Sequence, residues 1–412
     1  MGNLLKIAIR NLFRYKRRTL LTSSLITIGV VFVLVFVSIT GSFKSMMIAQ
    51  NTDAMLGHLQ IHLKGYVASI ENLPLNLNLK PKAMARLENI LKEQSEIEAY
   101  SPRIKFGAMF STFVETTNIR LNGVYPDKES AVAPLLPARV LEGEKNLKRG
   151  NIWIPELLAK GMKAKVGDSV VIVATNTDGS VNGKQFKVAG ILESVTGPGG
   201  RDGYIHIEDA AEVLRMGVME ISEVAVRLKD FDQLDSFSGK LSTLLAQELN
   251  QQKKPIFELH TWEKLSPFYN IARIIDLMTL FMKLMLIAVV LVSIMNVMIM
   301  SVYERIREIG TMAAIGTPPG RILSMFLLEG LSLGIGGAIL GNLAGSIIIF
   351  ILNLLKISYN FGRQQGLILR ADINPVDIIV LSLIVIAIAV IASLQPAFKA
   401  SRMEPIKALR HV

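Results

Sequence analysis

The residues best suited to chemistry form a charged cluster, Glu304, Arg305, Arg307 and Glu308, which follows about 20 uncharged residues. Both signs of charge on one short helix suit ion pairing in a groove on a partner protein. Losing one member of a buried interfacial pair typically costs about 2–5 kcal/mol. The same charges also suit the end of a membrane span at water, so the residues alone leave both interpretations open.

Other candidate sites give weaker signals. His58 and His62 stand four residues apart, which on a helix could hold a metal ion, but the alternation in HLQIHL predicts a strand. The glycine-rich stretch TGPGGRDG, 196–203, lacks the GxxxxGK[ST] arrangement of a phosphate loop, so we expect a turn there. The chain has no cysteine, which excludes disulfides and thiolate sites. We therefore expect no catalytic residue, no metal site and no cofactor-binding residue in this chain.

The composition is the first guide to the kinds of structure that must hold the charged cluster in place. Half of the 412 residues are hydrophobic, yet 19% are charged, so we expect membrane spans together with a sizeable water-soluble domain. The net charge of +11 could indicate nucleic-acid binding. In a membrane chain it fits better the gathering of Lys and Arg at cytoplasmic membrane edges, and we expect no nucleic acid.

Four segments are long and apolar enough to span a bilayer, which needs about 20 apolar residues per helix. They lie between Arg18 and Lys44, Lys283 and Glu304, Glu329 and Lys356, and Asp377 and Lys399. The first is too long for a cleavable signal peptide and lacks a clear cleavage site, so we expect an uncleaved anchor. A long loop separates the first two spans.

Lysines and arginines near the span ends predict the orientation. Most of them lie in the N-terminal stretch, beside the charged cluster and in the C-terminal tail, although the loop between the last two spans also carries three. Both termini and the cluster are therefore expected in the cytoplasm, with the long loop outside. The stretch NLLKIAIRNLFRYKRR reads as a basic amphipathic helix on an anionic surface, although simple flanking charge would give the same topology.

The long loop reads as an α+β domain without a spanning segment. Alternation in HLQIHL, NIRLNGVY and EVAVRL predicts strands, and PKAMARLENILKEQ and LDSFSGKLSTLLAQELNQQ have helical spacing. Two further strands are expected around the turn dipeptides Asp178-Gly179 and Asn182-Gly183. We expect two lobes, with the strand-rich lobe near 140–207.

Glycines recur on one face of the third span, in steps of three or four residues: Gly330, Gly334, Gly337, Gly341 and Gly345. Small residues at this spacing let helix backbones approach closely in a membrane. We expect a helix-packing face, either within the chain or against another subunit. Glu329, at the start of this span, would cost about 2.5–3.5 kcal/mol in mid-bilayer. It should therefore reach the interface or another helix, or else serve a substrate.

Two cytoplasmic motifs carry a family resemblance. ERIREIGTMAAIG, from Glu304, resembles the ERxREIGxxxAxG signature of FtsX-like ABC transporter permeases, and PAFKASRMEPIKALR, 396–410, resembles the cytoplasmic end of that family. RNLFRYKRRT, 10–19, is similar to its N-terminal helix. Outer stretches resemble the MacB-like and lipoprotein-releasing (LolC/LolE-type) branch, so that the resemblance covers nearly the whole chain: GHLQIHLKGY, LNGVYP, AKVGDSVVI, FKVAGIL and TWEKLSP.

The resemblance implies an integral membrane α-helical fold with four transmembrane helices in a bacterial inner membrane. A large α+β periplasmic domain is inserted between helices 1 and 2, and an FtsX-like permease domain covers about 273–405. The boundaries expected are 1–18 for a cytoplasmic amphipathic helix, 19–43 for the first span, 44–272 for the periplasmic domain, 273–303 for a stalk and the second span, 304–320 for a cytoplasmic coupling helix, 321–355 for the third span, 356–376 for a short periplasmic loop, 377–398 for the fourth span and 399–412 for a cytoplasmic tail.

The resemblance also implies partners. The ATPase-coupling helix would contain Glu304, Arg305, Arg307, Glu308, Ile309 and Gly310. Because the chain has no Walker motif, ATP and magnesium would be bound by a separate cytoplasmic ATPase, in two copies, that moves this helix. A second permease subunit would complete a homo- or heterodimer. The motion would rearrange the periplasmic domains, a mode called mechanotransmission, in which substrates are loaded from the periplasm or the outer leaflet.

The function implied is extraction or export of amphiphilic substrates, lipoproteins or lipids first, by a permease that is not itself an enzyme. Met285, Ile294 and Met298 could line a cavity for acyl chains, although plain lipid contact would also explain them. NTDGSVNGK, 176–184, is short where one lipoprotein-releasing permease carries a hook for a periplasmic carrier, so docking of a carrier or adaptor stays open. The alternatives are MacB-type efflux of peptides or antibiotics, and signalling to a cell-wall hydrolase.

Overall fold

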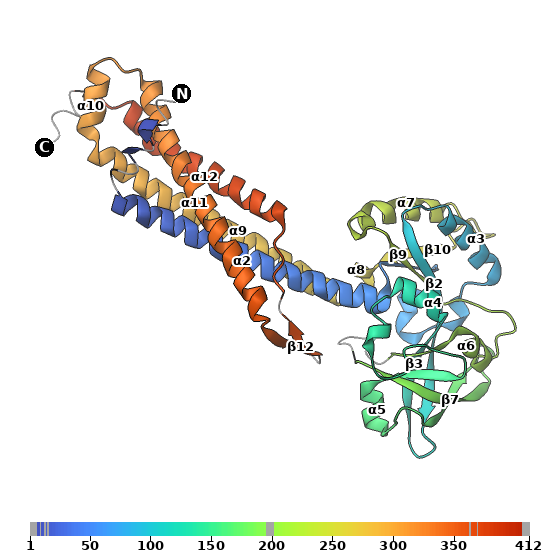
Figure 1. Cartoon of the computed structure of the whole chain (residues 1–412). Coiled ribbons are helices and arrows are strands. Elements are labelled where there is room, and N and C mark those ends of the chain that lie inside the picture. The colour runs from blue at the N-terminus through green and yellow to red at the C-terminus, as the bar shows by residue number, and fades with distance from the viewer. Residues whose placement is uncertain are drawn as a thin grey trace. The chain divides into compact units, whose positions relative to one another are not determined.

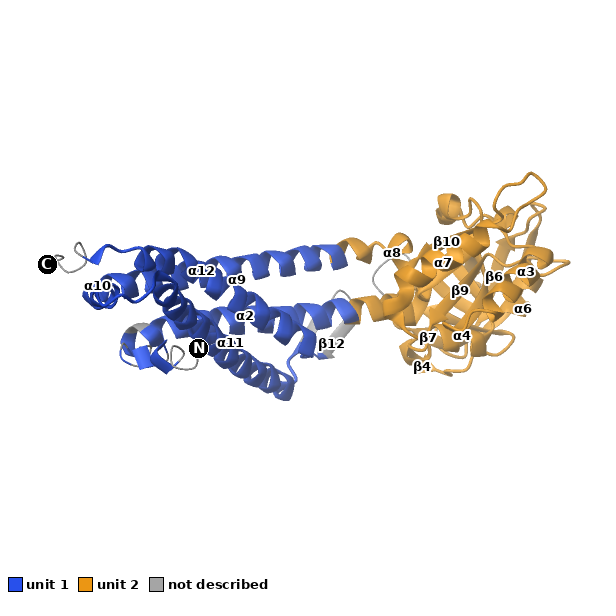
Figure 2. Cartoon of the chain, turned by 90° about the horizontal axis from the view of Figure 1, so that it is seen from above, with its two compact units in different colours: residues 1–45, 272–359, 366–412 blue, residues 46–271, 360–365 orange. Residues whose placement is uncertain are grey.

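The computed structural model describes residues 6–405 except 9, 12, 13, 15, 195–201, 362, 363 and 369. The chain forms two compact units (Figure 2). The helical unit comprises residues 1–45, 272–359 and 366–412, and the outer unit comprises residues 46–271 and 360–365.

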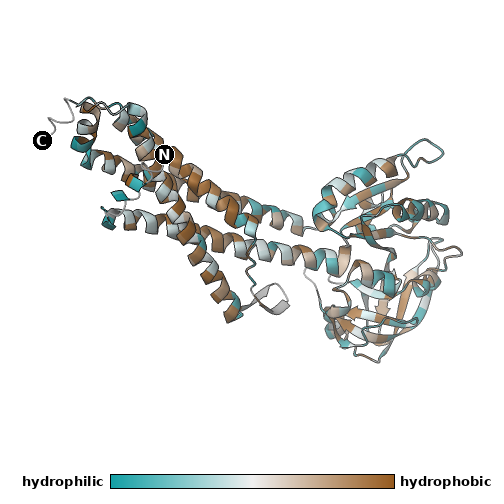
Figure 3. Ribbon diagram, turned by 45° about the horizontal axis from the view of Figure 1, so that its top comes forward, coloured by the Kyte–Doolittle hydropathy of each residue, from teal (hydrophilic) through white to brown (hydrophobic). Residues whose placement is uncertain are grey.

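Long apolar helices build the helical unit (Figure 1). They are α2 (Lys16–Asn51), α9 (Phe268–Glu304), α11 (Pro319–Leu355) and α12 (Pro375–Ser401). Hydrophobic residues run along them (Figure 3), and in the part of the chain that the structure describes these four are long and apolar enough to cross a membrane. The 37 residues of α9 extend about 55 Å at 1.5 Å per residue, more than the roughly 30 Å of a bilayer core. The prediction of four apolar helices is confirmed.

The four helices pack around one apolar core. Lipid supplies no hydrophobic drive between helices, so this contact depends on close fit. Each helix contributes fully buried residues to it, among them Ile26, Val30, Val290, Ile294, Phe326 and Val385.

A short helix, α10 (Ile306–Ala314), joins α9 to α11. It is shorter than the expected 304–320, because Arg305 leaves helical geometry, at φ −114° and ψ 19°, and so separates α10 from α9. Between α11 and α12, where a short loop was expected, the chain forms a hairpin of β11 (Ser358–Phe361) and β12 (Gln364–Ile368).

The turn after α10 depends on glycine rather than on proline. Gly316 has φ 88°, the left-handed conformation that closes many helices. Pro319 is the first residue of α11, where its missing N–H removes no helical bond. The break expected at Pro318-Pro319-Gly320 therefore lies slightly earlier, and the prolines begin the next helix.

The outer unit is α+β, as predicted. Its strands are β1 (Leu59–Leu63), β2 (Ile97–Ser111), β3 (Thr116–Val124), β4 (Val140–Gly143), β5 (Asn151–Pro155), β6 (Ser169–Thr175), β7 (Val181–Leu192), β8 (Asp202–His206), β9 (Glu223–Leu228) and β10 (Phe257–Thr261). Its α-helices are α3 (Pro81–Lys92), α4 (Pro126–Val132), α5 (Glu156–Met162), α6 (Ile207–Val213), α7 (Leu234–Ala246) and α8 (Trp262–Leu265). Its π- and 3-10 turns are η1 (Thr52–Leu56), η2 (Val67–Asn72), η3 (Leu75–Leu77), η4 (Pro137–Arg139) and η6 (Phe231–Gln233). The strands predicted from HLQIHL, NIRLNGVY and EVAVRL correspond to β1, β3 and β9, and the two predicted helices correspond to α3 and α7.

Strand pairing explains the strand-rich lobe expected near 140–207. β2 pairs with β3, β3 with β8, β8 with β5, β5 with β7, β7 with β6, and β6 returns to β2, which closes a ring. The first part of β2 pairs instead with β9, which continues to β1 and β10. The lobe therefore needs β2 and β3 from earlier in the chain, and the 15-residue strand β2 belongs to both parts of the sheet.

The segments that lead out of α2 and into α9 are tied together within the outer unit. β1 follows α2 through η1, β10 precedes α9 through α8, and β1 and β10 pair antiparallel, with Leu59 opposite Thr261. The hydroxyl of Ser266 also donates to Oδ1 of Asn51 at 3.0 Å, in a buried position. If the end of α2 and the start of α9 moved relative to each other, the pairing of β1 with β10 would therefore be strained.

Candidate functional site

Arg305 occupies the junction between α9 and α10 and is only 5% exposed. Its Nη1 donates to Oε2 of Glu329 at 3.2 Å, and its Nε donates to Oε2 of Glu308 at 3.0 Å. With the Asn11 amide turned so that its oxygen faces the guanidinium, that oxygen accepts at 3.0 Å, and the ring centroid of Phe326 lies 5.4 Å from the guanidinium carbon. One buried cation therefore joins the N-terminal segment, α10 and α11.

Glu329 is the buried counter-charge on α11. It is 1% exposed, and Ser301 of α9 donates to its Oε1 at 3.3 Å. Buried charges are costly unless they are paired, particularly inside a membrane protein. Arg305 supplies the pairing, so the geometry supports contact with another segment among the roles expected for Glu329.

The other charges of the cluster lie at the surface. The Glu308 carboxylate is 44% exposed and accepts from Nη1 of Arg14 at 3.3 Å, and Glu304 and Arg307 are exposed. Arg305 is not available to a partner protein, because groups of this chain surround its guanidinium. Of the four charges expected to suit docking, Arg305 therefore lies inside the chain, and docking through Glu304, Arg307 and Glu308 stays a prediction.

Ile309 and Gly310 lie on the inner face of α10. Ile309 is fully buried in the apolar core of the helical unit, and Gly310 is buried as well. The helix is thus amphipathic, with its apolar face on the bundle and Arg307 exposed. A displacement of α10 would act on α11 through Arg305 and its carboxylate partner.

The first two glycines of the α11 face pack against α12. A Cβ atom at Gly330 would overlap the side chain of Ser393, and one at Gly334 would lie 2.5 Å from Cβ of Ala389. Ordinary carbon contacts are about 3.5–4.0 Å, so a side chain at either position would push α11 and α12 apart.

The remaining three glycines pack against α2. Cβ atoms at Gly337, Gly341 and Gly345 would lie 2.5, 2.6 and 2.8 Å from side-chain atoms of Ile26, Val30 and Leu34. Small residues thus allow α11 to approach two helices at once. The sequence left open whether this glycine face packs within the chain or against another subunit. In the structure it packs against helices of the same chain.

Met285 is placed differently from Ile294 and Met298. Ile294 and Met298 are fully buried in the apolar core, whereas Met285 is 49% exposed. Nine residues separate Met285 from Ile294, which is about two and a half helical turns, so the two side chains leave α9 on opposite sides. The three residues therefore differ in exposure and direction, and an acyl-chain cavity along α9 stays a prediction.

The outer unit contains a buried charge cluster that we did not predict. Arg103 on β2 pairs with Glu129 of α4 at 2.7 Å and with Glu223 of β9 at 3.0 Å. Lys105 and His62 each lie 3.5 Å from the second oxygen of Glu223. Burial acts to raise the pKa of Glu223, but Lys105, His62 and Arg103 hold that pKa below its usual value. Arg103 and Lys105 stand two residues apart on one strand, so their side chains share a face. This spacing is the sequence signal that could have revealed the cluster.

His58 and His62 are both buried beside or within β1. Nδ1 of His58 accepts from the amide of Leu228 at 3.1 Å, and the ring of His62 stacks on Tyr66 with the centroids 5.1 Å apart. Among the described residues, no group of three or more His, Cys, Asp or Glu side chains could hold a metal ion.

The stretch 176–184 forms a tight turn and the start of a strand. β6 ends at Thr175 and β7 begins at Val181, and the amide of Asn176 donates to the carbonyl of Ser180 at 2.8 Å. Gly179, at φ 81°, supplies the turn, as Asp178-Gly179 predicted, whereas Asn182-Gly183 lies inside β7 and does not turn. Most of the glycine-rich stretch 196–203 falls outside the described residues, and Asp202 and Gly203 begin β8.

Comparison with known proteins gives consistent matches over most of the chain. The profile described as MacB-like periplasmic core domain matches residues 19–244, and the profile described as FtsX-like permease C-terminal matches residues 280–405. The lipoprotein-releasing system transmembrane protein LolC of Xylella fastidiosa (strain Temecula1) is 24% identical over 313 residues, 71% of this chain and 72% of that protein. The uncharacterized ABC transporter permease YknZ of Bacillus subtilis is 24% identical over 99% of this chain and 98% of its own. The macrolide export ATP-binding/permease protein MacB of Shigella boydii is 28% identical over 47% of this chain and 28% of its own.

Proposed function

Because the chain belongs to the family with a MacB-like periplasmic core domain and an FtsX-like permease domain, we propose that it is the permease subunit of an ATP-driven transporter that takes amphiphilic substrates from the inner membrane or the periplasm. The relatives that share this architecture are ABC transporter permeases. The chain therefore serves as the membrane part of the machine, and a separate ATPase supplies the energy.

The observation that carries the proposal is the buried contact of Arg305 with Glu329 and Glu308. It connects a small charged helix to a membrane-spanning helix, which is the connection that an ATPase acting from outside the chain would need. A surface helix with no buried link to its neighbours could bind a partner but could not move the bundle. In this function α10 is the coupling helix, and Arg307 and Glu308 form its outer face.

The proposal places both termini and α10 in the cytoplasm and the outer unit in the periplasm, following the distribution of Lys and Arg. Two ATPase subunits would bind ATP and magnesium, and a second permease subunit would complete the membrane part. The turn at 176–180 is too short to serve as an extended hook. Docking of a periplasmic carrier would then fall to the second permease subunit.

Lipoproteins are the first substrate class, because the chain spans most of a relative named for lipoprotein release. Efflux of small amphiphiles is the second, favoured by the MacB-like domain match over more than half of the chain. In both cases the substrate has an apolar part that leaves the membrane or the periplasm. Identification of material that co-elutes with the purified transporter separates the two classes.

The test is co-purification of the chain with its cognate ATPase subunit. Arg307→Glu reverses an exposed charge on α10, and Arg273→Glu reverses an exposed arginine on α9 as a matched control. We expect Arg307→Glu to weaken ATPase association at least about tenfold, as loss of an interfacial ion pair does, and Arg273→Glu to retain it. A complex that survives Arg307→Glu unchanged, with full substrate-stimulated hydrolysis, would overturn the assignment of α10.

A further inference from the structure

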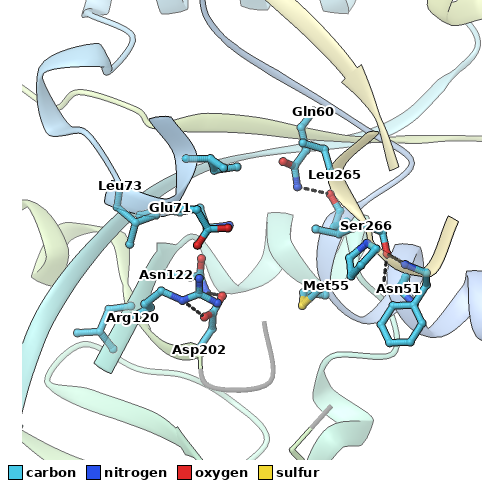
Figure 4. Close-up of a pocket in the computed structure, with 16 residues that line it drawn as sticks. Asn51, Met55, Gln60, Glu71, Leu73, Arg120, Asn122, Asp202, Leu265 and Ser266 are labelled. Atoms are coloured by element: carbon cyan, nitrogen blue, oxygen red, sulfur yellow. Dashed lines mark hydrogen bonds and ion pairs between the residues drawn. The ribbon is translucent and has the colours of Figure 1, made fainter. Parts of the chain in front are cut away.

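A small cavity of about 110 Å³ lies in the outer unit beside the segments that lead out of α2 and into α9. Figure 4 shows Asn51, Met55 and Ser266 on one side of it. Glu71 and Arg120 lie on the opposite side (Figure 4), together with Leu73, Asn122 and Asp202. By itself this cavity is smaller than the roughly 300–1,000 Å³ of most ligand sites.

A larger trough of about 850 Å³ adjoins the cavity, since Glu71, Leu73 and Arg120 line both. It crosses the outer surface of the strand ring, over β2, β3 and β6. Gly107 contributes no side chain to it, while Met109 is 49% exposed and Val181 is 61% exposed beside it. These apolar side chains stand among polar ones, Asn72, Asn118 and Thr175, so the trough offers an amphiphile both apolar contact and hydrogen-bond partners.

The charged side chains around the cavity and the trough differ in whether they are free to bind a ligand. Arg120 donates from Nε to Asp202 at 2.9 Å, and the ammonium of Lys105 lies 3.5 Å from Glu223. Glu71, in contrast, is exposed, and its carboxylate takes part in no hydrogen bond or ion pair among the described residues. The junction of cavity and trough therefore presents one uncommitted carboxylate beside apolar surface.

We propose that the cavity and trough form a binding site for a cationic amphiphile, a molecule with an apolar body and an amino or guanidino group. The apolar body lies in the trough over Gly107, Met109 and Val181, and the cation lies against the Glu71 carboxylate. The site rests on the proposed function, since it assigns a charge class and a place in the outer unit to the amphiphilic substrate. Both a basic peptide and a small amine have this chemistry.

The charge of the outer unit leaves the choice of ligand to local groups. Residues 46–271 carry 26 lysines and arginines against 27 aspartates and glutamates, so the unit has almost no net charge of its own, and the Glu71 carboxylate decides which sign of ligand the junction of cavity and trough attracts. An anionic headgroup would meet the Glu71 carboxylate unfavourably and would find Arg120 and Lys105 already paired.

Because the chain has no cysteine, an introduced cysteine can report on the trough alone. Met109→Cys, labelled with an environment-sensitive fluorophore, places the reporter on its wall, and Ser242→Cys on exposed α7 is the control site. The full chain is reconstituted in nanodiscs of zwitterionic lipid. The probes are a short peptide of alternating Leu and Lys, its Leu and Glu counterpart, and a short-chain alkylamine.

We expect the Leu and Lys peptide, the alkylamine or both to change the Met109→Cys fluorescence and to leave the Ser242→Cys fluorescence unchanged. A response to the peptide alone identifies a basic peptide as the ligand, and a response to the alkylamine alone identifies a small amine. Glu71→Gln should weaken binding about three- to fivefold, as loss of an exposed ion pair does. Gly107→Leu should weaken it more than about tenfold, because its side chain occupies the part of the trough where the apolar body lies. It should also fold, because nothing lies within 4 Å of a Cβ atom there, as is also true of the control Gly239→Leu on α7.

Equal binding of the Leu and Glu peptide, no response to either cationic probe, or insensitivity to both Glu71→Gln and Gly107→Leu would overturn the site. The proposed function would be unaffected by that result, because it is tested through the association of α10 with the ATPase. Conversely, loss of ATPase coupling in Arg307→Glu should leave probe binding unchanged.

Discussion

Replacing Glu329 with leucine leaves the guanidinium of Arg305 buried without its carboxylate partner on α11. The two side chains are 5% and 1% exposed and 3.2 Å apart. Removing one partner of a buried pair costs about 3–5 kcal/mol. Because Arg305 keeps Glu308 and Asn11, we expect the lower end, about 3 kcal/mol, or a fall in Tm of about 6–12 °C.

Replacing both members should reverse most of this loss. Arg305→Met with Glu329→Leu removes the uncompensated charge, and substitution of a whole buried pair by apolar residues is often neutral or stabilising. We therefore expect the double variant to unfold within about 1 kcal/mol of the wild type, while substrate-stimulated hydrolysis by the bound ATPase is lost, because α10 no longer pulls on α11.

The assay is thermal unfolding of the full chain in detergent, followed by circular dichroism at the helix band. Both tryptophans, Trp153 and Trp262, lie in the outer unit, so their fluorescence transition serves as an internal control and should not move. A single variant as stable as the wild type would refute the energetic reasoning. A double variant that keeps full coupling would refute the role given to the pair.

Three further outcomes follow from the geometry. Gly337→Ile should destabilise the helical unit by about 1–3 kcal/mol, because its Cβ atom would lie 2.5 Å from Ile26, whereas Gly336→Ile on the same helix meets nothing within 4 Å and should keep the wild-type Tm. Gly316→Val should cost about 1–3 kcal/mol in the same unfolding assay, since φ 88° is strained for a β-branched residue; an unchanged Tm would contradict the role of this turn. The pKa of Glu223 lies below its ordinary value of 4.5, so the stability it contributes is fully present above about pH 4.5 and is lost as the pH falls below it; tryptophan-monitored Tm should decline in that range, and a flat profile for wild type and Glu223→Gln alike would contradict this.

Much of the fold was readable from local patterns. Hydrophobic length predicted the four helices, because a bilayer core imposes a fixed minimum on every span. Alternation predicted β1, β3 and β9, since side chains on a strand alternate between its two faces, although the structure buries both faces of β1 and β9. Spacing of three and four residues placed the five glycines on one face, because an α-helix repeats every 3.6 residues.

Partners distant in sequence were not readable in this way. Nothing near Arg305 along the chain indicates that its guanidinium turns inward to Glu329 rather than outward. The same limit hid the charge cluster around Glu223, whose members come from four elements, β1, β2, α4 and β9. It also hid that Met285 and Ile294 leave α9 on opposite sides, because chemical likeness along a helix does not say which side faces the core.

The sequence by itself determined the kinds of element, their order and the family, because these depend on length, periodicity and motifs that are local to the chain. Only the tertiary structure decided which charges are buried, which helices the glycines face and where a trough opens on the strand ring. Those features depend on close contact between segments hundreds of residues apart, such as Asn11 and Arg305. Burial and pairing are properties of that contact and not of either segment alone.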